Sequence, residues 1–592
     1  MTYLEKLSKI RSLMKERGID GYIIPSSDPH ISEYLPDYYK CIVWTSGFSG
    51  SAGTLVITQD FAGLWTDSRY FVQGPAQLKG SGFELVKLKV QHAPEYVSWL
   101  GDKLQAGNTV AFDGNLASLA VANAVNTILG PLNIKVDGHV DLLDVIWNDR
   151  PALPTEPAYT LPISITGQST PDKIAAVRKV LKQKRATCHL ISSLDDLAWV
   201  LNIRGTDVKC NPVTLGFVFI SQDKSILFID SKKLDKGTAE ELQGYGILIK
   251  PYEEVRNYLK SLGTSETILL DPKRTCFATY DSVPEGVTIL EDMNPSTMLK
   301  AVKNEVELNH ERHAMINDGV ALTKFFKWIE ENVASGELSE MSIADHLRGL
   351  RAEQPGFKDI SFDTIAGYKD HGALPHYKAE LDSNYKLEAK GLLLVDSGGQ
   401  YETGTTDITR VVSLGQLTQE EKEDYTIVLK GTIEGSMAIF TKGTRGYQID
   451  AITRRPIWAT MRNYGHGTGH GVGFFLNVHE GPHTFNGAAV DIAIEPGMIS
   501  SIEPGLYREG KHGIRIENLV VSKDLASNQF GDFMDFETIT ICYIATDLVE
   551  KSLLDQVHID WLNNYNQWVY ESLESKLSAE EAAWLKEKTK AI

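Results

Sequence analysis

Four acidic residues in the last third of the chain stand in two pairs, each pair on the arms of an expected β-hairpin. Asp396 ends one apolar run and Asp407 precedes another, so strands that pair about their midpoint would bring the two aspartates nearly opposite each other. Glu503 and Glu517 flank a turn centred on Gly510 in the same way. Like charges on opposed strand residues are destabilising. Two such pairs in one region therefore predict a bound cation.

A glycine-dense segment, residues 465–473, adds candidate imidazole ligands in His466 and His470. Its glycines argue against a helix, so the two histidines are not a helical HExxH pair, and they let the backbone approach a metal closely. Two aspartates, two glutamates and one imidazole suit Mn²⁺ or a similar divalent ion. Four carboxylates can bridge two ions about 3.5–4 Å apart that activate a shared hydroxide. The alternative, solvated surface hairpins with incidental histidines, explains each residue alone but not their combination.

Composition excludes several classes of protein. The 592 residues include 59 Lys and Arg against 78 Asp and Glu, a formal charge of −19 that disfavours a nucleic-acid partner. The five cysteines are scattered without a CxxC pair, which argues against a zinc finger or a disulfide framework. No apolar run reaches membrane-spanning length, and the charged start lacks the apolar core of a signal peptide. We therefore expect a cytoplasmic protein with no membrane partner.

Two breaks divide the chain into three expected domains, residues 1–155, 156–300 and 301–592. Four prolines between residues 148 and 163 predict an extended linker, and residues 294–297 form a weaker break before a helical run. Residues 53–71 align with residues 216–234 at a constant offset of 163. This alignment predicts an α/β unit that is used twice.

The third segment is expected to open with helices over about 306–333 and 342–351 and to end helically from about residue 553. Ser578 and Glu581 form the pattern of a capping box at the last helix. Trp561, Tyr565 and Trp568 would share one helical face. Packing of these rings on their own domain is favoured over a subunit interface.

At the acidic pairs and the glycine-rich segment, the chain resembles the pita-bread metallopeptidases, the group that contains methionine aminopeptidase, prolidase, creatinase and aminopeptidase P. Over its whole length it is similar to the three-domain, cytosolic aminopeptidase P (X-prolyl aminopeptidase) type. The motifs that carry the resemblance are VDSGGQY at 395–401, GTTDITR at 404–410, HGTGHGVG at 466–473, NVHEGP at 477–482, SIEPG at 501–505, RIEN at 515–518, SGFSGSAG at 46–53 and WTDSRY at 65–70.

The resemblance implies a fold and a metal centre. The fold would be two related creatinase N-terminal-like α/β domains followed by a pita-bread catalytic domain with a helical C-terminal extension. Asp396 would ligate one ion, and His470 and Glu503 the other. Asp407 and Glu517 would bridge both ions. The cofactors would be two divalent ions, with Mn²⁺ expected.

The resemblance also implies an activity, the release of the first residue from peptides with proline second. A hydroxide shared by the two ions would attack the scissile carbonyl. Glu503 would move the proton, and His376 and His479 would polarise the carbonyl. The residues expected to bind substrate or to orient the ligands are Arg69, His376, His466, His479, Tyr507 and Arg515.

Some neighbouring residues are expected to have no catalytic part. His371 and His483 are interpreted as bystanders, Arg410 as structural, and Ser49 as a turn residue, since it lacks the G-x-S-x-G spacing of a nucleophilic serine. Without the resemblance, pairing with the nearby Asp67 would be the simpler interpretation of Arg69.

Other functions remain open at this stage. Prolidase, which cleaves X-Pro dipeptides, shares the ligand set, whereas a creatinase-like hydrolase would lack part of it. A catalytically silent pita-bread binding module would have lost the ligands. The length and the duplicated front domains favour aminopeptidase P. The resemblance further makes a homodimer an expectation.

Overall fold

The computed structural model describes residues 1–90 and 93–592, which form two compact units. The first unit comprises residues 1–163 and 168–297, and the second comprises residues 164–167 and 298–592. Within the described ranges, no helix is both long and apolar enough to cross a membrane. The predicted linker, residues 148–163, contains no helix as far as Pro162, and a short helix begins at its last residue, Ile163. The division into three domains at residues 155 and 300 stays a prediction.

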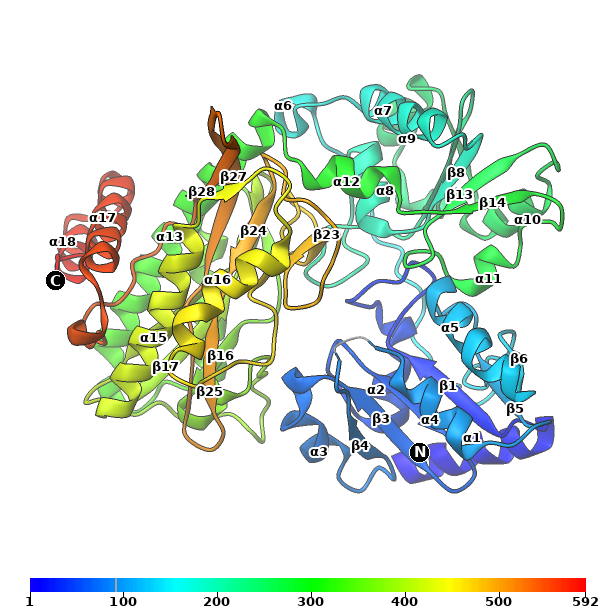
Figure 1. The fold of residues 1–592 in the computed structure, drawn as a ribbon, viewed down its shortest axis with the longest axis horizontal. Coiled ribbons are helices and arrows are strands. Elements are labelled where there is room, and N and C mark those ends of the chain that lie inside the picture. Colours follow the sequence, from blue (N-terminus) through cyan, green and yellow to red (C-terminus); the bar gives the residue numbers. More distant parts are fainter. Residues whose placement is uncertain (91–92) are drawn as a thin grey trace. The chain divides into compact units, whose positions relative to one another are not determined.

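The first unit contains two six-stranded sheets built to one plan (Figure 1). One sheet consists of β1 (Gly21–Pro25), β2 (Thr54–Ile57), β3 (Ala62–Thr66), β4 (Glu84–Lys87), β5 (Thr109–Phe112) and β6 (Lys135–Asp137). The other consists of β8 (Cys188–Ile191), β10 (Phe217–Ser221), β11 (Ser225–Phe228), β12 (Ile247–Lys250), β13 (Thr267–Leu270) and β14 (Thr288–Glu291). The strand orders are β4-β3-β2-β1-β5-β6 and β12-β11-β10-β8-β13-β14, so the two sheets correspond strand by strand.

The repeated sequence coincides with the repeated structure. Strands β2 and β10, and strands β3 and β11, start 163 residues apart. Asp67 and Asp230, also 163 apart, each accept a backbone hydrogen bond at the start of a short 3-10 helix, from Arg69 and Lys232 respectively. The prediction of two related α/β folds is therefore confirmed.

Helices accompany both sheets. The first sheet has α1 (Tyr3–Arg17), α2 (Cys41–Ser46), α3 (Gln73–Leu78), α4 (Glu95–Lys103) and α5 (Leu119–Leu129). The second has α7 (Thr170–Gln183), α8 (Leu194–Leu201), α9 (Lys236–Gly244), α10 (Val255–Lys260) and α11 (Phe277–Tyr280). A two-stranded sheet joins β7 (Tyr159–Thr160) to β9 (Ile203–Arg204), and α6 (Ile163–Thr166) and α12 (Pro295–Ala301) lie where the chain passes between the units.

The second unit is built from helices around small antiparallel sheets. Its long helices are α13 (Glu305–Asn332), α14 (Glu340–Ala352), α15 (Gln419–Ser436) and α16 (Gly446–Trp458). Three sheets consist of β15 (Phe357–Ile360), β18 (Gly399–Tyr401) and β19 (Gly404–Thr405); of β16 (Ile365–Tyr368), β17 (Leu392–Ser397) and β20 (Ile408–Ser413); and of β25 (Gly505–Arg508) and β26 (His512–Arg515). The largest sheet consists of β21 (Phe440–Thr441), β28 (Gly531–Thr538), β27 (Asn518–Asn528), β24 (Ile499–Ile502), β22 (Gly469–Gly471) and β23 (Glu480–Phe485), in that order.

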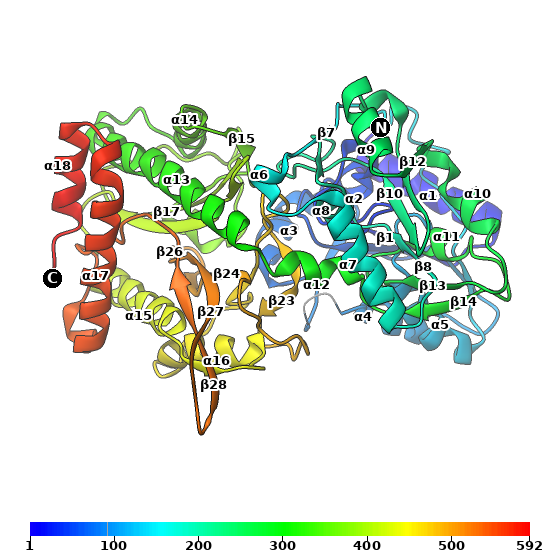
Figure 2. The ribbon, with the colours of Figure 1, turned by 90° about the horizontal axis from the view of Figure 1, so that it is seen from above.

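Figure 2 shows β17, β24 and β26 between the pair α13 and α14 on one side and the pair α15 and α16 on the other, while β28 extends past α16. One hydrophobic core joins these layers and includes Phe325 of α13, Leu393 of β17, Val428 of α15 and Leu519 of β27. This layered core agrees with the predicted pita-bread fold. In this architecture, buried strands end at charged residues and can therefore hold those residues in place at a site.

The C-terminal segment forms α17 (Gln556–Leu573) and α18 (Ala579–Lys588), which lie side by side at one end of the unit (Figures 1 and 2). The predicted capping box is present, since Ser578 accepts from the Glu581 backbone and Glu581 accepts from the Ser578 backbone. Tyr565 is buried in the core of its own unit, and Trp561 stacks on it with ring centroids 5.1 Å apart. The expected packing within one domain is thus confirmed for both rings.

Candidate metal centre

Each predicted acidic ligand lies at or beside the end of a buried strand. Asp396 is the penultimate residue of β17, and Asp407 directly precedes β20. Glu503 directly follows β24, where Pro504 prevents a ladder hydrogen bond, and Glu517 directly precedes β27. Strand ends place these carboxylates at the edge of the apolar core while the strands fix their backbones.

The register of the first hairpin differs from the prediction. Asp396 pairs with Thr409, and Tyr401 pairs with Gly404, so two residues form the turn. The pairing is therefore shifted by two residues, and Asp407 lies diagonal to Asp396 on the same face. A diagonal separation of about 7–8 Å between backbones leaves more room for a cation than direct opposition does.

The second hairpin has the predicted register. Tyr507 pairs with Gly513 around the turn, and Ile502 pairs with Asn518 beyond it. The same register places Glu503 opposite Glu517. Gly510 in the turn has a φ of +70°, a conformation that favours glycine. This pair of opposed glutamates is confirmed.

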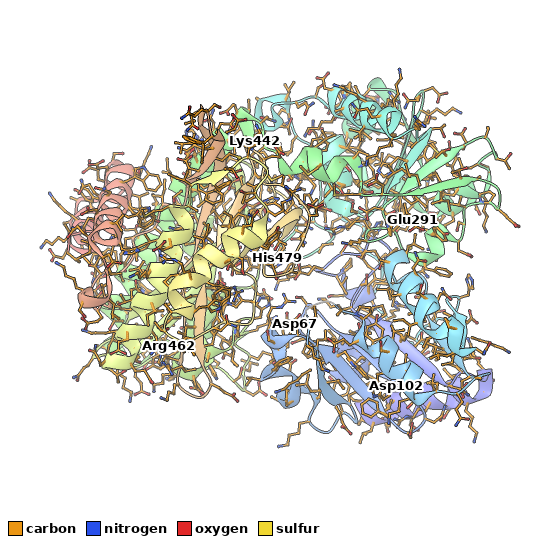
Figure 3. The ribbon with its side chains drawn as sticks, viewed as in Figure 1. Asp67, Asp102, Glu291, Lys442, Arg462 and His479 are labelled. Carbon is orange, nitrogen blue, oxygen red and sulfur yellow. The ribbon has the colours of Figure 1, made fainter. Side chains whose placement is uncertain are left out.

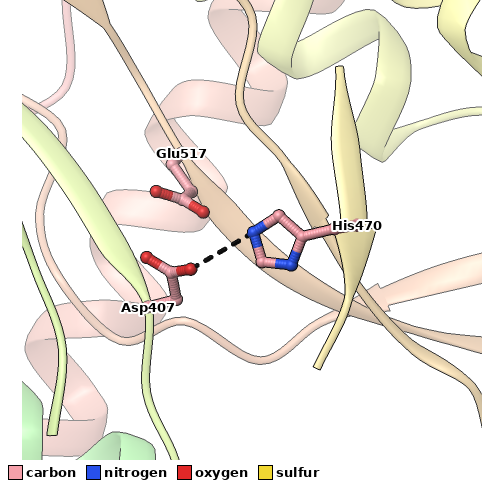
Figure 4. A group of neighbouring side chains, drawn as sticks. All are labelled: Asp407, His470 and Glu517. Carbon is pink, nitrogen blue, oxygen red and sulfur yellow. Dashed lines mark ion pairs between the residues drawn. The ribbon is translucent and has the colours of Figure 1, made fainter. Parts of the chain in front are cut away.

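His470 joins the acidic residues from a third strand, β22. Figure 4 shows Asp407, His470 and Glu517 converging, and one candidate ligand atom from each lies within 4.8 Å of the others. His470 Nε2 is 3.4 Å from Asp407 Oδ2 and 3.4 Å from Glu503 Oε1. Gly469 lets β22 pack this closely, because a Cβ there would lie 1.8 Å from the Ser501 carbonyl oxygen.

The ring of His470 is oriented as a metal ligand requires. Its Nδ1 lies 2.9 Å from the Gly471 carbonyl oxygen, so Nδ1 donates and Nε2 is the ring atom that faces the carboxylates, where it would ligate an ion after losing its proton. Burial alone would lower the pKa of His470, but the hydrogen bond to Asp407 and the charge of Glu503 raise it to about 9. Without metal, a protonated ring thus supplies the positive charge.

The carboxylates disfavour one another's charge. Burial and the neighbouring acids raise the pKa of Glu517 well above its usual range. Burial, with a contribution from Asp407, raises the pKa of Glu503 to about 7. Burial also raises the pKa of Asp396, against the opposing charge of Arg515. Burial of these carboxylates away from water destabilises the folded protein unless a cation compensates their charge.

The residues present fit two divalent ions. Asp396 Oδ1 and Glu517 Oε1 are buried and have no hydrogen-bond partner within the described ranges. Oxygen atoms that lack a donor in an acidic, buried setting are available to a hard or borderline cation. Four carboxylates and one imidazole are sufficient donors for a shared pair of ions.

A chain of hydrogen bonds orients the ligands from behind. Arg515 Nη2 donates to Asp396 Oδ2 at 2.5 Å, and Arg515 Nη1 donates to the Tyr507 hydroxyl at 2.7 Å. The Tyr507 hydroxyl lies 2.6 Å from His466 Nε2, while His466 Nδ1 is 2.7 Å from the Gly467 carbonyl oxygen. His466 Nδ1 therefore donates a hydrogen bond to the carbonyl, and His466 Nε2 accepts one from the Tyr507 hydroxyl. His466, Tyr507 and Arg515 are thus brought together beside Asp396.

The two remaining predicted histidines also lie near this centre. The His479 ring, labelled in Figure 3, stands edge-on to the His470 ring with centroids 4.4 Å apart. His376 follows Pro375, whose carbonyl accepts a hydrogen bond from Arg515 at 3.3 Å. The segment that carries His376 is therefore tied to the arginine that contacts Asp396.

Arg69 lies in the first unit. Its Nε and Nη2 each donate to Asp67 at 2.8 Å, the pairing that its neighbourhood in the sequence suggests. Its role at the substrate stays a prediction.

The residues that were expected to have no catalytic part make structural contacts. Arg410 is buried and donates to the carbonyls of Glu517, Cys542 and Tyr543, which ties β20 to its neighbours. The His371 ring stacks between Tyr377 and Tyr385. His483 is buried, and burial lowers its pKa to about 3.

Sequence reasoning missed Thr409. Its hydroxyl donates to Glu517 Oε2 at 2.7 Å, and Arg515 Nε donates to the same hydroxyl at 3.3 Å. Because Thr409 pairs with Asp396, it faces the ligands from the strand that follows Asp407. The signal was present: Asp407 and Thr409 are two residues apart and therefore share a strand face.

Comparisons with known proteins cover the whole chain. Residues 309–524 match metallopeptidase family M24 and residues 532–592 match the C-terminal region of that family. Residues 6–146 and 149–307 each match a creatinase/prolidase N-terminal domain. A relative from Sordaria macrospora, named "Probable Xaa-Pro aminopeptidase P", is 39% identical over 589 residues and is matched over 96% of each chain.

The chain belongs to the Xaa-Pro aminopeptidase P family of M24 metallopeptidases. A Laccaria bicolor relative with the same name is 39% identical over 98% of this chain and 92% of its own. The crystal structure of an X-prolyl aminopeptidase from Caenorhabditis elegans, described as a cytosolic enzyme with a di-nuclear active site, superposes with a TM-score of 0.96 at 35% identity over 100% of both chains.

A smaller relative shares the fold alone. The Xaa-Pro dipeptidase from Bacillus anthracis is 24% identical with a TM-score of 0.51, and it covers 63% of this chain and 98% of its own. These findings confirm the predicted family and the predicted metal-dependent aminopeptidase, and they favour it over prolidase. They also support a site for two divalent ions.

Proposed function

We propose that this protein is an X-prolyl aminopeptidase that removes the first residue from peptides with proline at the second position. The observation that carries the proposal is the convergence of Asp407, His470 and Glu517, with Glu503 opposite Glu517, in a chain similar along its full length to aminopeptidases P. Asp396 completes the proposed ligand set. We propose Mn²⁺ as the ion, because the donors are four carboxylates and one imidazole.

In the proposed reaction, the protein's own residues bind and orient the substrate and transfer protons. Two divalent ions held by the proposed ligands would lower the pKa of bound water and would polarise the scissile carbonyl. Glu503, whose pKa is about 7 without metal because of burial, is suited to accept a proton and return it to the leaving proline nitrogen. His376 and His479 would donate hydrogen bonds to the carbonyl oxygen as negative charge develops there.

Proline requires a dedicated binding site. An X-Pro bond is a tertiary amide without an N–H, so a peptidase that holds its substrate as an extended strand loses one hydrogen bond. His466 and Tyr507, whose ring centroids are 5.4 Å apart, would provide walls that recognise the pyrrolidine ring by shape. The acidic surroundings of Asp396 and Asp407 would attract the free α-amine of the first residue.

The test is hydrolysis of an X-Pro-Pro tripeptide by the chelated protein with and without added Mn²⁺. We expect activity only after Mn²⁺ is restored, and its loss in Asp407→Ala. Cleavage that persists in Asp407→Ala, or a protein that takes up no Mn²⁺, would contradict the proposal.

Prolidase activity is tested in the same assay with a Gly-Pro dipeptide. Turnover of Gly-Pro as fast as that of the tripeptide would favour the dipeptidase. A protein that binds peptides but cleaves neither substrate would be a non-catalytic binding module.

We further propose a cytoplasmic homodimer in which Arg69 contacts the substrate. All five cysteines are free thiols, as expected in a reducing compartment, and the Caenorhabditis elegans relative is described as cytosolic. Trp568 of α17 remains 36% exposed and could contribute to a subunit contact. Light scattering that gives the mass of one chain would contradict the dimer.

An unchanged KM for the tripeptide in Arg69→Lys would contradict the proposed role of Arg69 at the substrate.

A further inference from the structure

The reverse face of the aspartate hairpin carries two hydroxyl residues directly beside the proposed ligands. Ser397 follows Asp396, and Thr406 precedes Asp407. Successive side chains of a strand point to opposite faces, so Ser397 and Thr406 face away from the metal centre. Both are fully buried, each at 0% exposure.

Behind these hydroxyls lies a buried ion pair between α13 and α14. Arg351 Nε donates to Asp318 Oδ1 at 2.6 Å, and Arg351 Nη2 donates to Asp318 Oδ2 at 3.0 Å. Both side chains have 0% exposure. The forked geometry fixes the relative position of the two groups more tightly than a single contact would.

The ion pair holds both arms of the hairpin. Arg351 Nη2 donates to Ser397 Oγ at 3.1 Å, and Thr406 Oγ1 donates to Asp318 Oδ2 at 2.9 Å. Thr406 Oγ1 also accepts from the Gly399 backbone at 2.8 Å, and the Tyr401 hydroxyl donates to Asp318 Oδ1 at 2.9 Å. Each arm is therefore attached one residue away from a proposed ligand.

We propose that the Asp318–Arg351 pair is a positioning device that sets the separation between Asp396 and Asp407, and so allows the centre to hold two ions. The inference rests on the proposed ligand set. Neither residue touches the ions or the substrate; both act through Ser397 and Thr406. An apolar pair of similar volume often gives equal stability at such a position, so the specific gain from a buried ion pair is geometric. Groups that orient metal ligands in this way typically change affinity by about 10–100-fold when they are removed.

The test uses Thr406→Val, which removes the hydroxyl at nearly constant volume, and Thr406→Ser, which restores it. Chelated protein is titrated with Mn²⁺ by calorimetry, and the spin coupling of the Mn²⁺ pair is followed by electron paramagnetic resonance. We expect Thr406→Val to weaken binding of one ion by about 10-fold or more and to diminish the coupled signal. Thr406→Ser should recover both, and Ser397→Ala should behave like the valine variant.

Arg348→Met is the matched control. Arg348 lies on the same helix, α14, and its ion pair with Asp359 is exposed. The Arg348→Met variant should bind both ions with the affinity of the unaltered protein.

The outcomes separate this inference from the proposed function. Two ions bound with unaltered affinity in both Thr406→Val and Ser397→Ala would overturn the positioning role, even if those proteins melt earlier, and would leave the peptidase proposal standing. Equal weakening in the valine and serine variants would overturn it as well, because the hydroxyl would not be responsible. Failure of the unaltered protein to bind two ions would contradict both proposals.

Discussion

The acidic side chains of the metal centre are an electrostatic cost to the folded chain when no cation is present. Glu517 is 1% exposed, and burial together with Asp407, Glu503 and Asp396 raises its pKa. Its Oε1 lacks a hydrogen-bond donor in the described part of the chain. A carboxylate in this setting serves metal binding at the expense of the stability of the metal-free protein.

Glu517→Gln should separate these two effects. The amide keeps the shape of the side chain and removes its negative charge. We expect the thermal midpoint of the chelated protein to stay constant or to rise, because like-charge repulsion is relieved. Tripeptide hydrolysis with Mn²⁺ should fall by about 100-fold or more, since even removal of groups that only orient ligands costs about 10–100-fold. A lower midpoint together with retained hydrolysis would contradict this assignment.

Arg515→Lys tests the hydrogen-bond chain behind Asp396. Lysine keeps the charge but cannot contact Asp396, Tyr507 and Thr409 with one planar group. We expect Mn²⁺ affinity and kcat both to fall, by about 10–100-fold. Arg508→Lys is the control, because Arg508 lies on the neighbouring strand, β25, and pairs with Asp424 of α15 instead of a proposed ligand. Normal Mn²⁺ affinity in Arg515→Lys would show that the forked contact does not orient Asp396.

At the scale of elements, one buried carboxylate organises the segment that carries His376. Glu340, in the first turn of α14, accepts hydrogen bonds from the Tyr368 and Tyr385 backbones at 2.9 and 2.8 Å. It also accepts from the Tyr377 hydroxyl at 2.8 Å and contacts His371 Nδ1 at 2.9 Å. Four contacts from residues 368–385 converge on one side chain. The segment is thereby held against α14 at both of its ends.

Glu340→Gln should loosen this segment and lower kcat. The amide cannot accept all four contacts, so His376 would be held less firmly. If His376 stabilises the transition state, kcat and kcat/KM should fall together, by about 10-fold, with Mn²⁺ stoichiometry unchanged. Glu337→Gln is the control, since the Glu337 side chain is exposed and lies 4.0 Å from Lys386. Unaltered kinetics in Glu340→Gln, or loss of Mn²⁺, would contradict this role.

At the scale of the whole molecule, buried histidines make the fold sensitive to acid. His189 on β8 is fully buried, and its Nδ1 lies 2.9 Å from the Leu269 carbonyl oxygen. Burial lowers its pKa from 6.5 to about 4. At pH 7 the ring is neutral in both the folded and the unfolded states. Below pH 6.5 the unfolded chain binds a proton that the folded chain resists, so stability falls as the pH falls.

Chemical denaturation at pH 7 and pH 5 measures this effect. From pH 7 to pH 5 we expect the free energy of unfolding of the first unit to fall by about 2 kcal/mol because of His189. His189→Asn should lose that part of the pH dependence. His139→Asn, an exposed histidine of the same unit, should retain it. The same pH dependence in both variants would contradict the prediction.

Local sequence was sufficient for much of the fold and for the identity of the proposed ligands. The apolar runs end at Asp396 and before Asp407, the alignment at an offset of 163 marks corresponding strands, and the register of the second hairpin follows from its glycine turn. These features depend on side-chain alternation and turn chemistry, which act over a few residues. The residue types in the motifs then indicate a metal centre, because opposed acids require a cation.

The tertiary structure decided the features that join distant segments. It brought the Thr409 hydroxyl against Glu517 and Arg515. It also brought Asp318 and Arg351 behind Ser397 and Thr406, and Glu340 against the segment of His376. These contacts depend on which helix packs on which strand, and residues so far apart in the sequence carry no local signal of that packing. The sequence determines what the centre can bind, and the packing of α13 and α14 determines how its ligands are held.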